Sequence, residues 1–383
     1  MAEATRERVQ EAAALIRSEA PAAEADGKLT EPVVALMRQA GVFGMTMSRE
    51  LGGPELSPLE QIEVIEAVAA ADGSAGWCGM INSDGGYMAA YLDRGVAREL
   101  YPTLDRATAV AATPSMQAQI KGDTYVVNGT APFLSGSTHA DVFFLNGVVM
   151  DDDGLRMSKS GPMPETRMCA VPASEVEVLH TWHATGLAAT ASHDVRLTDV
   201  VVPAERTFNI FDAVPADPSP LYSWRWMFFV NMTGVPLGVA RAALDLVKEV
   251  APGKVVFPDM TLANADPTLQ WNVGRAEALV GSARAYVFDT VGTLWDAVCA
   301  GRPPTPSEWT AVRLALTTAF HSAKEAVTLV YEALGTTGVY RKSPLDRELR
   351  DVTTMTQHIL VQSKTYANCG RSVLGLDPGG IAF

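Results

Sequence analysis

The segment SPLDRELRDVTTMTQH, residues 343–358, is the stretch of sequence that decides the fold. Ser343 suits the N-cap of a helix and Pro344 suits its first position, so a helix is expected to begin here. One face of that helix carries a cation, a carboxylate and an imidazole at helical spacing: Arg347, Asp351, Met355 and His358. Because an imidazole titrates near neutrality, His358 is a candidate general base for a substrate hydroxyl or N–H. The alternative interpretation is an amphipathic helix with a solvated ion pair and a packed histidine.

The same segment resembles the closing helix of the flavin-dependent monooxygenases built on the acyl-CoA dehydrogenase fold. Those enzymes are two-component hydroxylases that use free reduced flavin. They show the pattern P-L-x-R-x-x-R-D and then a histidine seven residues after the aspartate. This chain matches that pattern throughout, at Pro344, Leu345, Arg347, Arg350, Asp351 and His358.

The composition is that of a globular protein with two or three structural units in 383 residues. Acidic residues outnumber basic ones by 44 to 30, which gives a net charge of −14. No excess of Lys and Arg is available to neutralise phosphates, so neither nucleic acid nor an anionic membrane is expected as a partner. A small-molecule ligand is expected instead.

Three features predict a cytoplasmic protein. The N-terminal residues MAEATRERVQ are charged and helical, so no signal peptide is expected. The apolar residues 221–240 are interrupted by Arg225 and Asn231, which favours a buried helix over a membrane span. The four cysteines are far apart and form no C-x-x-C pair, which indicates reduced thiols: Cys78, Cys169, Cys299 and Cys369.

The chain divides into three blocks: helices in residues 1–110, short strands in 111–215 and long helices in 216–383. In the first block, Ser57 and Glu60 form a capping-box pattern, and Asp72-Gly73 ends the helix that follows. In the second, strands are expected at 141–149, 168–171, 176–179 and 195–202, and Asn128-Gly129 predicts a hairpin turn after residues 125–127. In the third, helical patterns cover 221–250, 267–300, 306–334 and 344–370.

This order of blocks resembles the acyl-CoA dehydrogenase superfamily. The expected fold is mainly α, with an N-terminal helical domain, a central antiparallel β-barrel-like domain and a C-terminal four-helix bundle. In that family the bundle packs as a homotetramer, and the flavin sites are often completed by a neighbouring subunit.

Two motifs in the β block resemble flavin contacts of the family. Residues 133–141, FLSGSTHAD, resemble its aromatic-x-S-G-x-x-H-A-D turn, in which the serine hydroxyl and backbone amides lie against the flavin; Ser135 and Gly136 are the main candidates. Residues 180–192 resemble its D-T-W-x-x-x-G-L-R-G-T-G-S segment. This chain departs from that segment where the family has Asp, Arg and the second Gly, at His180, Ala188 and Ala191. His180, His183 and His193 lack a carboxylate partner pattern, so no metal is expected.

The resemblance implies the remaining site residues. Flavin contacts are expected at Trp77, Thr113, Phe133, Ser137, Trp182, Thr190, Ser192, Arg275, Thr336 and Asp351. Asn82, Tyr87 and Met355 are expected in the substrate pocket. His358 and Ser135 are the catalytic candidates, with Ser135 holding the oxygen adduct by a hydrogen bond. Some relatives carry a second histidine near residue 82, and this chain has none there.

The implied function is a monooxygenase that hydroxylates a phenolic or indole-like molecule. Reduced FAD or FMN would come from a separate NAD(P)H:flavin reductase, and O2 would form a C4a-hydroperoxyflavin. Three alternatives stay open: an acyl-CoA dehydrogenase or oxidase, an N-oxygenase acting on an amine or amino sugar, and a scaffold that has lost its flavin. The dehydrogenase needs a carboxylate base, which residues 335–340 lack; Glu249 and Glu277 are the remaining candidates.

Overall fold

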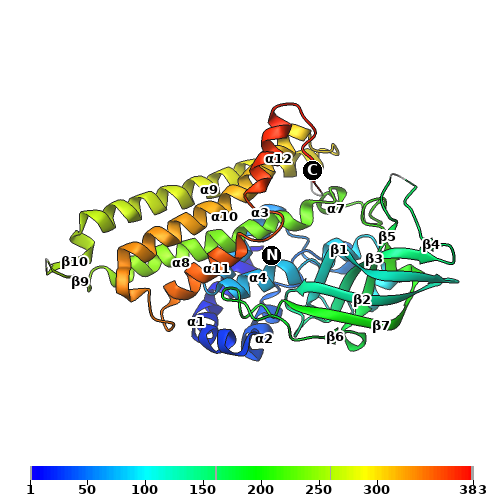
Figure 1. Ribbon diagram of the computed structural model, residues 1–383, viewed down its shortest axis with the longest axis horizontal. Helices are drawn as coiled ribbons and strands as arrows, with labels where there is room; N and C mark the ends of the chain where they lie inside the picture. Colours follow the sequence, from blue (N-terminus) through cyan, green and yellow to red (C-terminus); the bar gives the residue numbers. More distant parts are fainter. Residues whose placement is uncertain (1, 160–161, 259, 381–383) are drawn as a thin grey trace.

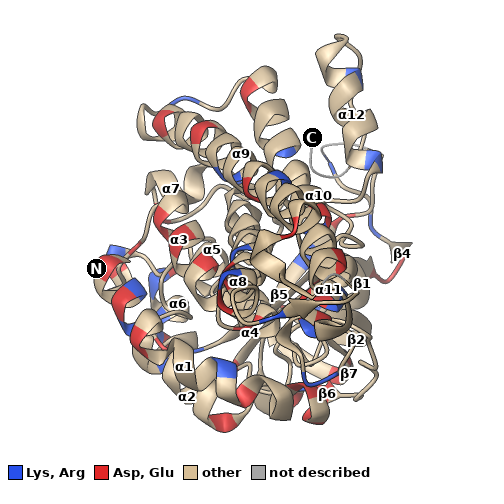
Figure 2. Ribbon diagram, turned by 90° about the vertical axis from the view of Figure 1, so that its left-hand side faces the viewer, with Lys and Arg blue, Asp and Glu red and all other residues tan. Residues whose placement is uncertain are grey.

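The computed structural model describes residues 2–159, 162–258 and 260–380. Figure 1 shows a helical bundle at one end of an elongated molecule and a β-sheet at the other, with the N-terminal helices packed where the two meet. In the view of Figure 2, basic and acidic residues are interspersed along the helices and form no single-sign stripe.

The N-terminal block is helical, as its periodicity predicts, and its boundaries follow local capping chemistry. Ser57 and Glu60 form the predicted capping box at the start of α3. The carboxylate of Asp72 accepts the N–H of Ala75 at 2.8 Å and thereby caps α4. The helices of this block are α1 (Ala2–Asp26), α2 (Glu31–Ala40), α3 (Pro58–Ala69), α4 (Gly73–Asn82), α5 (Gly85–Ala89) and α6 (Arg94–Leu100).

The central block is one sheet of eight strands in the order β6-β7-β2-β1-β3-β5-β8, with β4 beside β3. Its strands are β1 (Thr108–Lys121), β2 (Thr124–Leu134), β3 (Val142–Asp151), β4 (Gly154–Leu155), β5 (Thr166–Pro172), β6 (Glu177–Val178), β7 (His193–Pro203) and β8 (Thr207–Phe208). The strands expected at 141–149, 168–171, 176–179 and 195–202 are confirmed as β3, β5, β6 and β7, and residues 125–127 lie in β2.

Two details of the predicted β-domain are wrong. The sheet is mixed, because β1 and β3 run parallel, and within the described residues its edge strands β6 and β8 do not pair to close a barrel. The Asn128-Gly129 pair lies inside β2 and is not a hairpin turn. Tertiary contacts explain this: the Asn128 amide exchanges hydrogen bonds with Asp199 on β7 at 3.1 and 2.8 Å. Gly129 adopts a φ of +137° beside Met116, where a Cβ would come within 3.0 Å of the Met116 sulfur.

The C-terminal block packs α10 against α8, α9 and α11 (Figure 1). Its elements are α7 (Pro220–Ser223), η4 (Met227–Thr233), α8 (Gly234–Val250), the small β9 (Val255–Val256) and β10 (Thr261–Leu262) pair, α9 (Pro267–Cys299), α10 (Pro306–Leu334), η6 (Gly335–Thr337), α11 (Pro344–Met355) and α12 (Lys364–Val373). Among the described residues, the stretch Met227–Val250 is long and apolar enough to span a membrane, but 83% of its apolar window is buried inside the protein. The prediction of a buried segment there is therefore confirmed, but the single helix expected over residues 221–250 is wrong. The structure has α7 up to Ser223, a 3-10 helix in η4 and an α-helix only from Gly234, with Pro236 in its first turn.

The last predicted helix, residues 344–370, is two helices. The chain leaves helical geometry after Met355, where the N–H groups of Gln357 and His358 bond to carbonyls only three residues back. His358 therefore sits in a turn between α11 and α12 and not on the helix face. At the other end of α11, Ser343 occupies the N-cap position but its side chain makes no capping bond.

Close packing between α3 and α8 depends on glycine. A Cβ on Gly238 would lie 2.3 Å from the carbonyl oxygen of Glu66, which is closer than real atoms approach. We expect Gly238→Ala to lower the free energy of unfolding by about 2–3 kcal/mol, because a backbone atom and not a flexible side chain blocks the methyl group.

Gly281 on α9 provides a matched control, because nothing lies within 4 Å of its Cβ position. Gly281→Ala should stabilise the protein by about 0.5–1 kcal/mol through helix propensity. Urea unfolding of both variants measures these changes, and equal midpoints for the two would contradict the packing explanation.

Candidate active site

A chain of buried hydroxyl groups joins the two sequence motifs of the sheet block to α4. The indole N–H of Trp77 donates to Ser135 Oγ at 3.1 Å. The hydroxyl oxygens of Ser135 and Ser192 are 2.7 Å apart, and those of Ser192 and Thr190 are 2.6 Å apart. Thr190 Oγ1 in turn donates to the carbonyl of Leu187 at 2.8 Å. We refer to Ser135, Ser192 and Thr190 as the hydroxyl chain.

The hydrogen-bond partners at the two ends of the hydroxyl chain determine which hydroxyl donates to which. Each hydroxyl has one proton, and that of Thr190 goes to the Leu187 carbonyl. Ser192 must therefore donate to Thr190, and Ser135 must donate to Ser192. Because Ser135 also accepts the Trp77 N–H, it offers a bound ligand a lone pair and no proton. This refines the predicted role of Ser135, which left open whether its hydroxyl donates or accepts.

The turn at residues 135–137 is built around Asn82 and is not free to offer its amides. Gly136 N donates to the carbonyl of Thr190 at 2.7 Å, and Ser137 Oγ donates to the carbonyl of Ala191 at 2.7 Å. Gly136 has a φ of +73°, and a Cβ there would lie 2.1 Å from Asn82 Oδ1. The predicted contact between a flavin and the Gly136 amide is therefore not available in this arrangement, because that amide is already paired.

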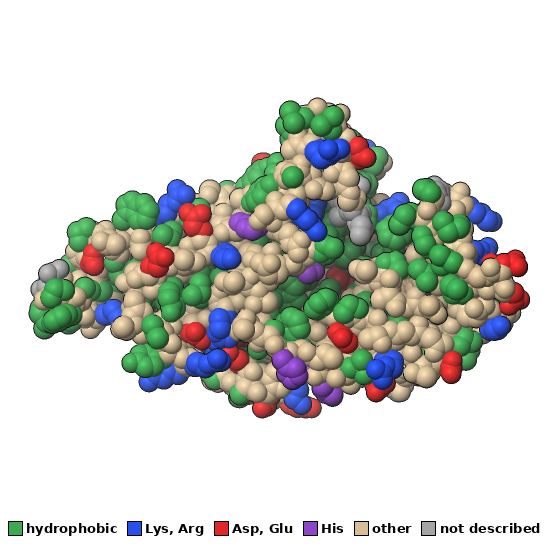
Figure 3. All heavy atoms as spheres, viewed as in Figure 1, with side chains coloured by type: hydrophobic (Ala, Val, Ile, Leu, Met, Phe, Trp, Pro, Cys, Tyr) green, Lys and Arg blue, Asp and Glu red, His purple; other side chains and the backbone are tan. Residues whose placement is uncertain are grey.

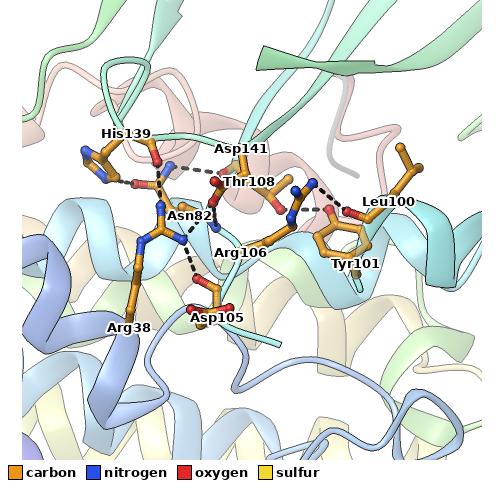
Figure 4. A network of polar contacts seen from close by, with 10 residues as sticks. Arg38, Asn82, Leu100, Tyr101, Asp105, Arg106, Thr108, His139 and Asp141 are labelled. Carbon is orange, nitrogen blue, oxygen red and sulfur yellow. Dashed lines mark hydrogen bonds and ion pairs between the residues drawn. The ribbon is translucent and has the colours of Figure 1, made fainter. Parts of the chain in front are cut away.

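Asn82 belongs to a buried polar network and not to a pocket wall (Figure 4). Its amide nitrogen donates to the carbonyls of Thr108 and Ser135, both at 3.0 Å. Its Oδ1 lies 3.0 Å from Nε2 of His139. Every polar group of the Asn82 side chain is thus engaged in the scaffold, which contradicts its predicted place in the substrate pocket.

The same network holds His139 neutral. Burial, and secondly the nearby Arg38 guanidinium, lower the pKa of His139 to about 4, because the opposing effect of the Asp141 carboxylate is smaller. Arg38 donates to Asp141 at 2.8 Å and to the His139 carbonyl at 3.0 Å (Figure 4). Since Asn82 Oδ1 can only accept, the His139 proton resides on Nε2.

His358 lies beside the Trp77 end of the hydroxyl chain. Its ring centroid is 5.6 Å from that of Trp77, in an edge-to-face arrangement. Burial, and secondly the positive charge of Arg313, lower the pKa of His358 to about 4, so the imidazole is neutral at pH 7. Met355, one turn earlier at the end of α11, is buried at 1% exposure.

Asp351 joins α11 to the second motif. Its Oδ1 accepts the N–H of Leu187 at 2.5 Å, and burial together with the neighbouring Asp72 carboxylate raises its pKa to about 7. Arg350 donates to the carbonyl of Thr185 at 2.6 Å in the same loop. Asp351 was predicted to contact flavin, but its carboxylate is committed to the loop that carries Thr190 and Ser192, so any effect on a cofactor is indirect.

Phe133 and Trp182 form an apolar rim. Phe133 is 70% exposed at a φ of +64°, a conformation that a bulky residue rarely adopts. Its ring is 6.3 Å from that of Trp182 in an edge-to-face pair. The Trp182 indole donates to the Leu187 carbonyl at 3.0 Å, which ties the rim to the hydroxyl chain.

Tyr87 does not join this cluster. It is buried, donates from its hydroxyl to Gln61 at 3.1 Å and packs edge-to-face on Tyr222. It lines a small aromatic cavity between α5 and the segment before η4, with Met88, Tyr91, Ile210, Tyr222, Trp224, Arg225 and Phe228. The structure therefore does not place Tyr87 beside His358, where the sequence predicted it.

Three predicted flavin contacts lie elsewhere. Thr113 is exposed on β1, and Arg275 on α9 is exposed and paired with Glu325 at 3.2 Å. Thr336 is exposed in η6. No contact described for the chain joins them to the hydroxyl chain, so their predicted flavin contacts stay predictions.

Sequence reasoning missed Arg313. It is 3% exposed on α10, and its Nη2 donates to the carbonyl of Leu360 at 2.7 Å in the turn that carries His358. The available signal was an arginine on the same helical stripe as Trp309, Leu316 and Phe320.

The cluster suits a flat, largely apolar heterocycle with polar edges. Trp77, Phe133, Trp182 and Met355 supply apolar surface, and Ser135 supplies a lone pair. Figure 3 shows a hollow between the bundle and the sheet, beneath the projecting α12, with hydrophobic side chains around it. Across the described residues, no group of three or more His, Cys, Asp or Glu side chains is placed to hold a metal ion.

The pH dependence of stability tests the neutral state of His139. Below pH 6.5 the unfolded chain binds a proton at position 139 that the folded protein accepts only near pH 4. Stability is therefore lost as the pH falls from 6.5 to 4, by about 3 kcal/mol. In His139→Asn this part of the loss should disappear.

The measurement is the difference in unfolding free energy between wild type and His139→Asn, by urea titration at pH 7 and pH 4.5. Asp351 and Glu348, whose pKa values burial raises to about 7 and about 8, act in the opposite direction in both proteins and cancel in the difference. A difference that does not change with pH would show that His139 titrates normally.

Comparison with known proteins agrees with this geometry. Residues 1–97 match the family model for the acyl-CoA dehydrogenase N-terminal domain, and residues 231–363 match that for its C-terminal domain. The indole-3-acetate monooxygenase of Pseudomonas putida is 30% identical over 352 residues, which cover 91% of this chain and 88% of that protein. The oxygenase component of the FADH2-dependent resorcinol hydroxylase of a Rhizobium species is 25% identical over 394 residues, covering 97% and 94%.

Among solved structures, XiaF from a Streptomyces species in complex with FADH2 superposes with a TM-score of 0.91 at 23% identity. The alignment covers 100% of this chain and 98% of XiaF, so the two share a fold over their whole length. From the sequence matches and the fold together, the chain belongs to the flavin-dependent monooxygenases of the acyl-CoA dehydrogenase superfamily.

Proposed function

We propose that the protein is the oxygenase component of a two-component system that hydroxylates an aromatic, phenolic or indole-like small molecule. It would take reduced FAD or FMN from a separate NAD(P)H:flavin reductase and use O2. The observation that carries this proposal is the distance of 5.6 Å between the ring centroids of His358 and Trp77. Because Trp77 donates to Ser135, the imidazole lies next to the hydroxyl chain, which contains residues of both motifs that resemble flavin contacts. The indole-3-acetate monooxygenase relative makes indole-3-acetate the first substrate to test.

A reduced flavin, when bound, supplies the electrons that activate O2. The chain provides the environment for that chemistry. Trp77 and Met355 are buried apolar side chains beside His358 and keep water from the reacting groups. Ser135 accepts a hydrogen bond from the ligand, because its own proton is committed to Ser192. The rim residues Phe133 and Trp182 cover an apolar edge.

His358 is the proposed proton acceptor for the substrate hydroxyl or N–H. It is neutral at pH 7, and its one lone pair, on Nδ1, accepts only a long hydrogen bond of 3.4 Å from the Leu360 N–H, which the substrate proton would replace. The carboxylates considered for dehydrogenase chemistry do not take this place. Glu277 is paired with Arg241 at 3.0 Å, and Glu249 is exposed on α8. No contact described for either glutamate reaches the hydroxyl chain, so hydroxylation is favoured over thioester dehydrogenation.

His358→Ala tests the assigned base. The variant should consume O2 with reduced flavin but release mainly H2O2, with the ratio of hydroxylated product to H2O2 falling about 100-fold or more. The assay combines product chromatography with peroxide detection, and anaerobic fluorescence titration with reduced flavin reports cofactor binding separately. Gln357→Ala, at the exposed neighbouring position, is the matched control and should retain coupling. Normal hydroxylation by His358→Ala would rule out this base.

We also propose a cytoplasmic homotetramer. Large apolar side chains are exposed around the tip of the bundle where β9 and β10 lie: Val255, Phe257, Met260, Leu262, Trp271 and Tyr340. Exposed apolar groups of this number are typical of a subunit interface. Thr336 and Arg275 are exposed on the bundle as well, so a neighbouring subunit could bring them to a flavin.

Light scattering on size-exclusion fractions should give a mass four times that of the 40.8 kDa chain. Trp271→Glu, at a position 64% exposed, should shift the mass toward smaller species because it would bury a charge in the interface. A monomeric wild-type protein would contradict the proposed assembly.

A further inference from the structure

His193, the first residue of β7, holds the main chain at Trp182. Its Nδ1 accepts the backbone N–H of Trp182 at 3.0 Å. Because a backbone N–H can only donate, Nδ1 carries the lone pair of the neutral imidazole and the proton resides on Nε2. An imidazolium has a proton on both ring nitrogens and no lone pair. This hydrogen bond therefore exists only while His193 is uncharged.

The hydrogen bond to His193 helps to fix the apolar rim. Trp182 is tied at its other end by the indole N–H, which donates to the Leu187 carbonyl at 3.0 Å. Its ring packs edge-to-face on Phe133 with the centroids 6.3 Å apart. Loss of the bond to His193 would free the main chain of Trp182 and so loosen the rim that this residue forms with Phe133.

His193 itself belongs to the sheet and not to the loop. It is buried, and it pairs in register with the apolar Leu134 on β2. It also directly follows Ser192 of the hydroxyl chain. The ladder of β2 and β7 holds its backbone, so its ring is a fixed acceptor to which the loop attaches.

The charged groups around His193 keep its imidazole neutral at pH 7. The ring centroid of His180 lies 5.0 Å from that of His193. Desolvation, and secondly His180 and His183, lower the pKa of His193 below its ordinary value of 6.5. The Asp194 carboxylate opposes this shift. Toward β6 the charged groups form an ion pair on the opposite, exposed face of β7: Arg196 and Glu177.

We propose that His193 is a positioning residue for Trp182, whose neutral imidazole holds the apolar rim in place and whose protonation in mildly acidic solution releases it and weakens the binding of reduced flavin. The flavin part of this inference rests on the proposed function. The alternative role for His193 is to fill space at the start of β7. A packing role depends on the size of the side chain, whereas the positioning role depends on an acceptor atom at the Nδ1 position.

Two substitutions of His193 separate the acceptor from its charge. His193→Asn keeps an acceptor, because the Asn Oδ1 is attached to Cγ as Nδ1 is, and it does not titrate between pH 5 and 8. His193→Leu keeps bulk and removes the acceptor. His180→Asn is the matched control, because His180 is an exposed histidine beside the same ring and its φ of +51° is one that Asn tolerates.

Hydrogen–deuterium exchange of the peptide that contains Trp182, measured by mass spectrometry on the protein without flavin, tests the hydrogen bond itself. Intrinsic exchange also varies with pH, so every variant is compared with wild type at the same pH. The wild-type amide should lose protection about 5- to 10-fold between pH 7.5 and pH 5. His193→Asn should stay protected and His193→Leu should be unprotected throughout. His180→Asn should keep the wild-type transition but at higher pH, because one repelling charge is gone.

Anaerobic fluorescence titration with reduced FAD and reduced FMN tests the consequence for binding. The Kd of wild type should rise about 3- to 10-fold over the same pH range relative to that of His193→Asn. A wild-type amide that stays protected at pH 5, or a His193→Asn variant that loses protection in parallel with wild type, would overturn the proposal. If Trp182 protection follows His193 in a protein that binds neither reduced flavin, the proposed function fails and the control of the rim by His193 stands.

Discussion

The hydrogen bond between the Asp351 carboxylate and the N–H of Leu187 is the interaction on which the geometry of the site depends. It joins the helical bundle to the sheet block at 2.5 Å. The carbonyl of Leu187 then accepts from both Thr190 and Trp182, so the same residue terminates the hydroxyl chain and positions the aromatic rim. Gly186 permits this approach, because a Cβ there would lie 2.1 Å from the Arg350 carbonyl oxygen.

These contacts start at α11 and lead back to the turn that follows it. From Leu187 the hydroxyl chain leads to Ser135 and Trp77, and Trp77 meets His358 in the turn that follows α11. Asp351 lies on α11 itself. The loop of residues 180–192 and the segment of residues 351–358 therefore fix each other's position. A shift of either would move the imidazole relative to the hydroxyl chain.

Around the candidate site the two histidines are neutral, whereas the ion pairs lie farther away, behind Asp351. Burial keeps His358 and His139 neutral at pH 7. Behind Asp351, Arg347 pairs with Asp72 at 3.3 Å, and Arg350 pairs with Glu24 at 2.6 Å. These ion pairs compensate buried carboxylates.

Departures from the family pattern have structural consequences within the loop of residues 180–192. Ala191 stands where relatives have a second glycine, yet it adopts a φ of +44°, and Leu187 adopts +51°. A loop with such strained backbone conformations is stable only because contacts with the surrounding structure hold it there. Here Ser137 holds the Ala191 carbonyl and Asp351 holds Leu187, so the hydroxyl chain keeps its shape without the glycine.

The sequence by itself determined the three blocks, the boundaries of α9 and α10, the starts of α3 and α11, and the segments that meet at the site. It did so because capping residues, apolar periodicity and motif spacing are local properties. It also singled out Ser135, Trp77 and His358, which the structure brings together. Only the tertiary structure decided what each group can do. The turn after α11, where Arg313 on α10 bonds to the Leu360 carbonyl, the parallel pairing of β1 with β3 and the commitment of Asn82 to the scaffold all follow from contacts between residues distant in the chain. The direction of the hydroxyl chain and the charge of Arg313 beneath His358 likewise depend on burial and on partners, because a hydrogen bond or a pKa is a property of the surroundings and not of the residue type.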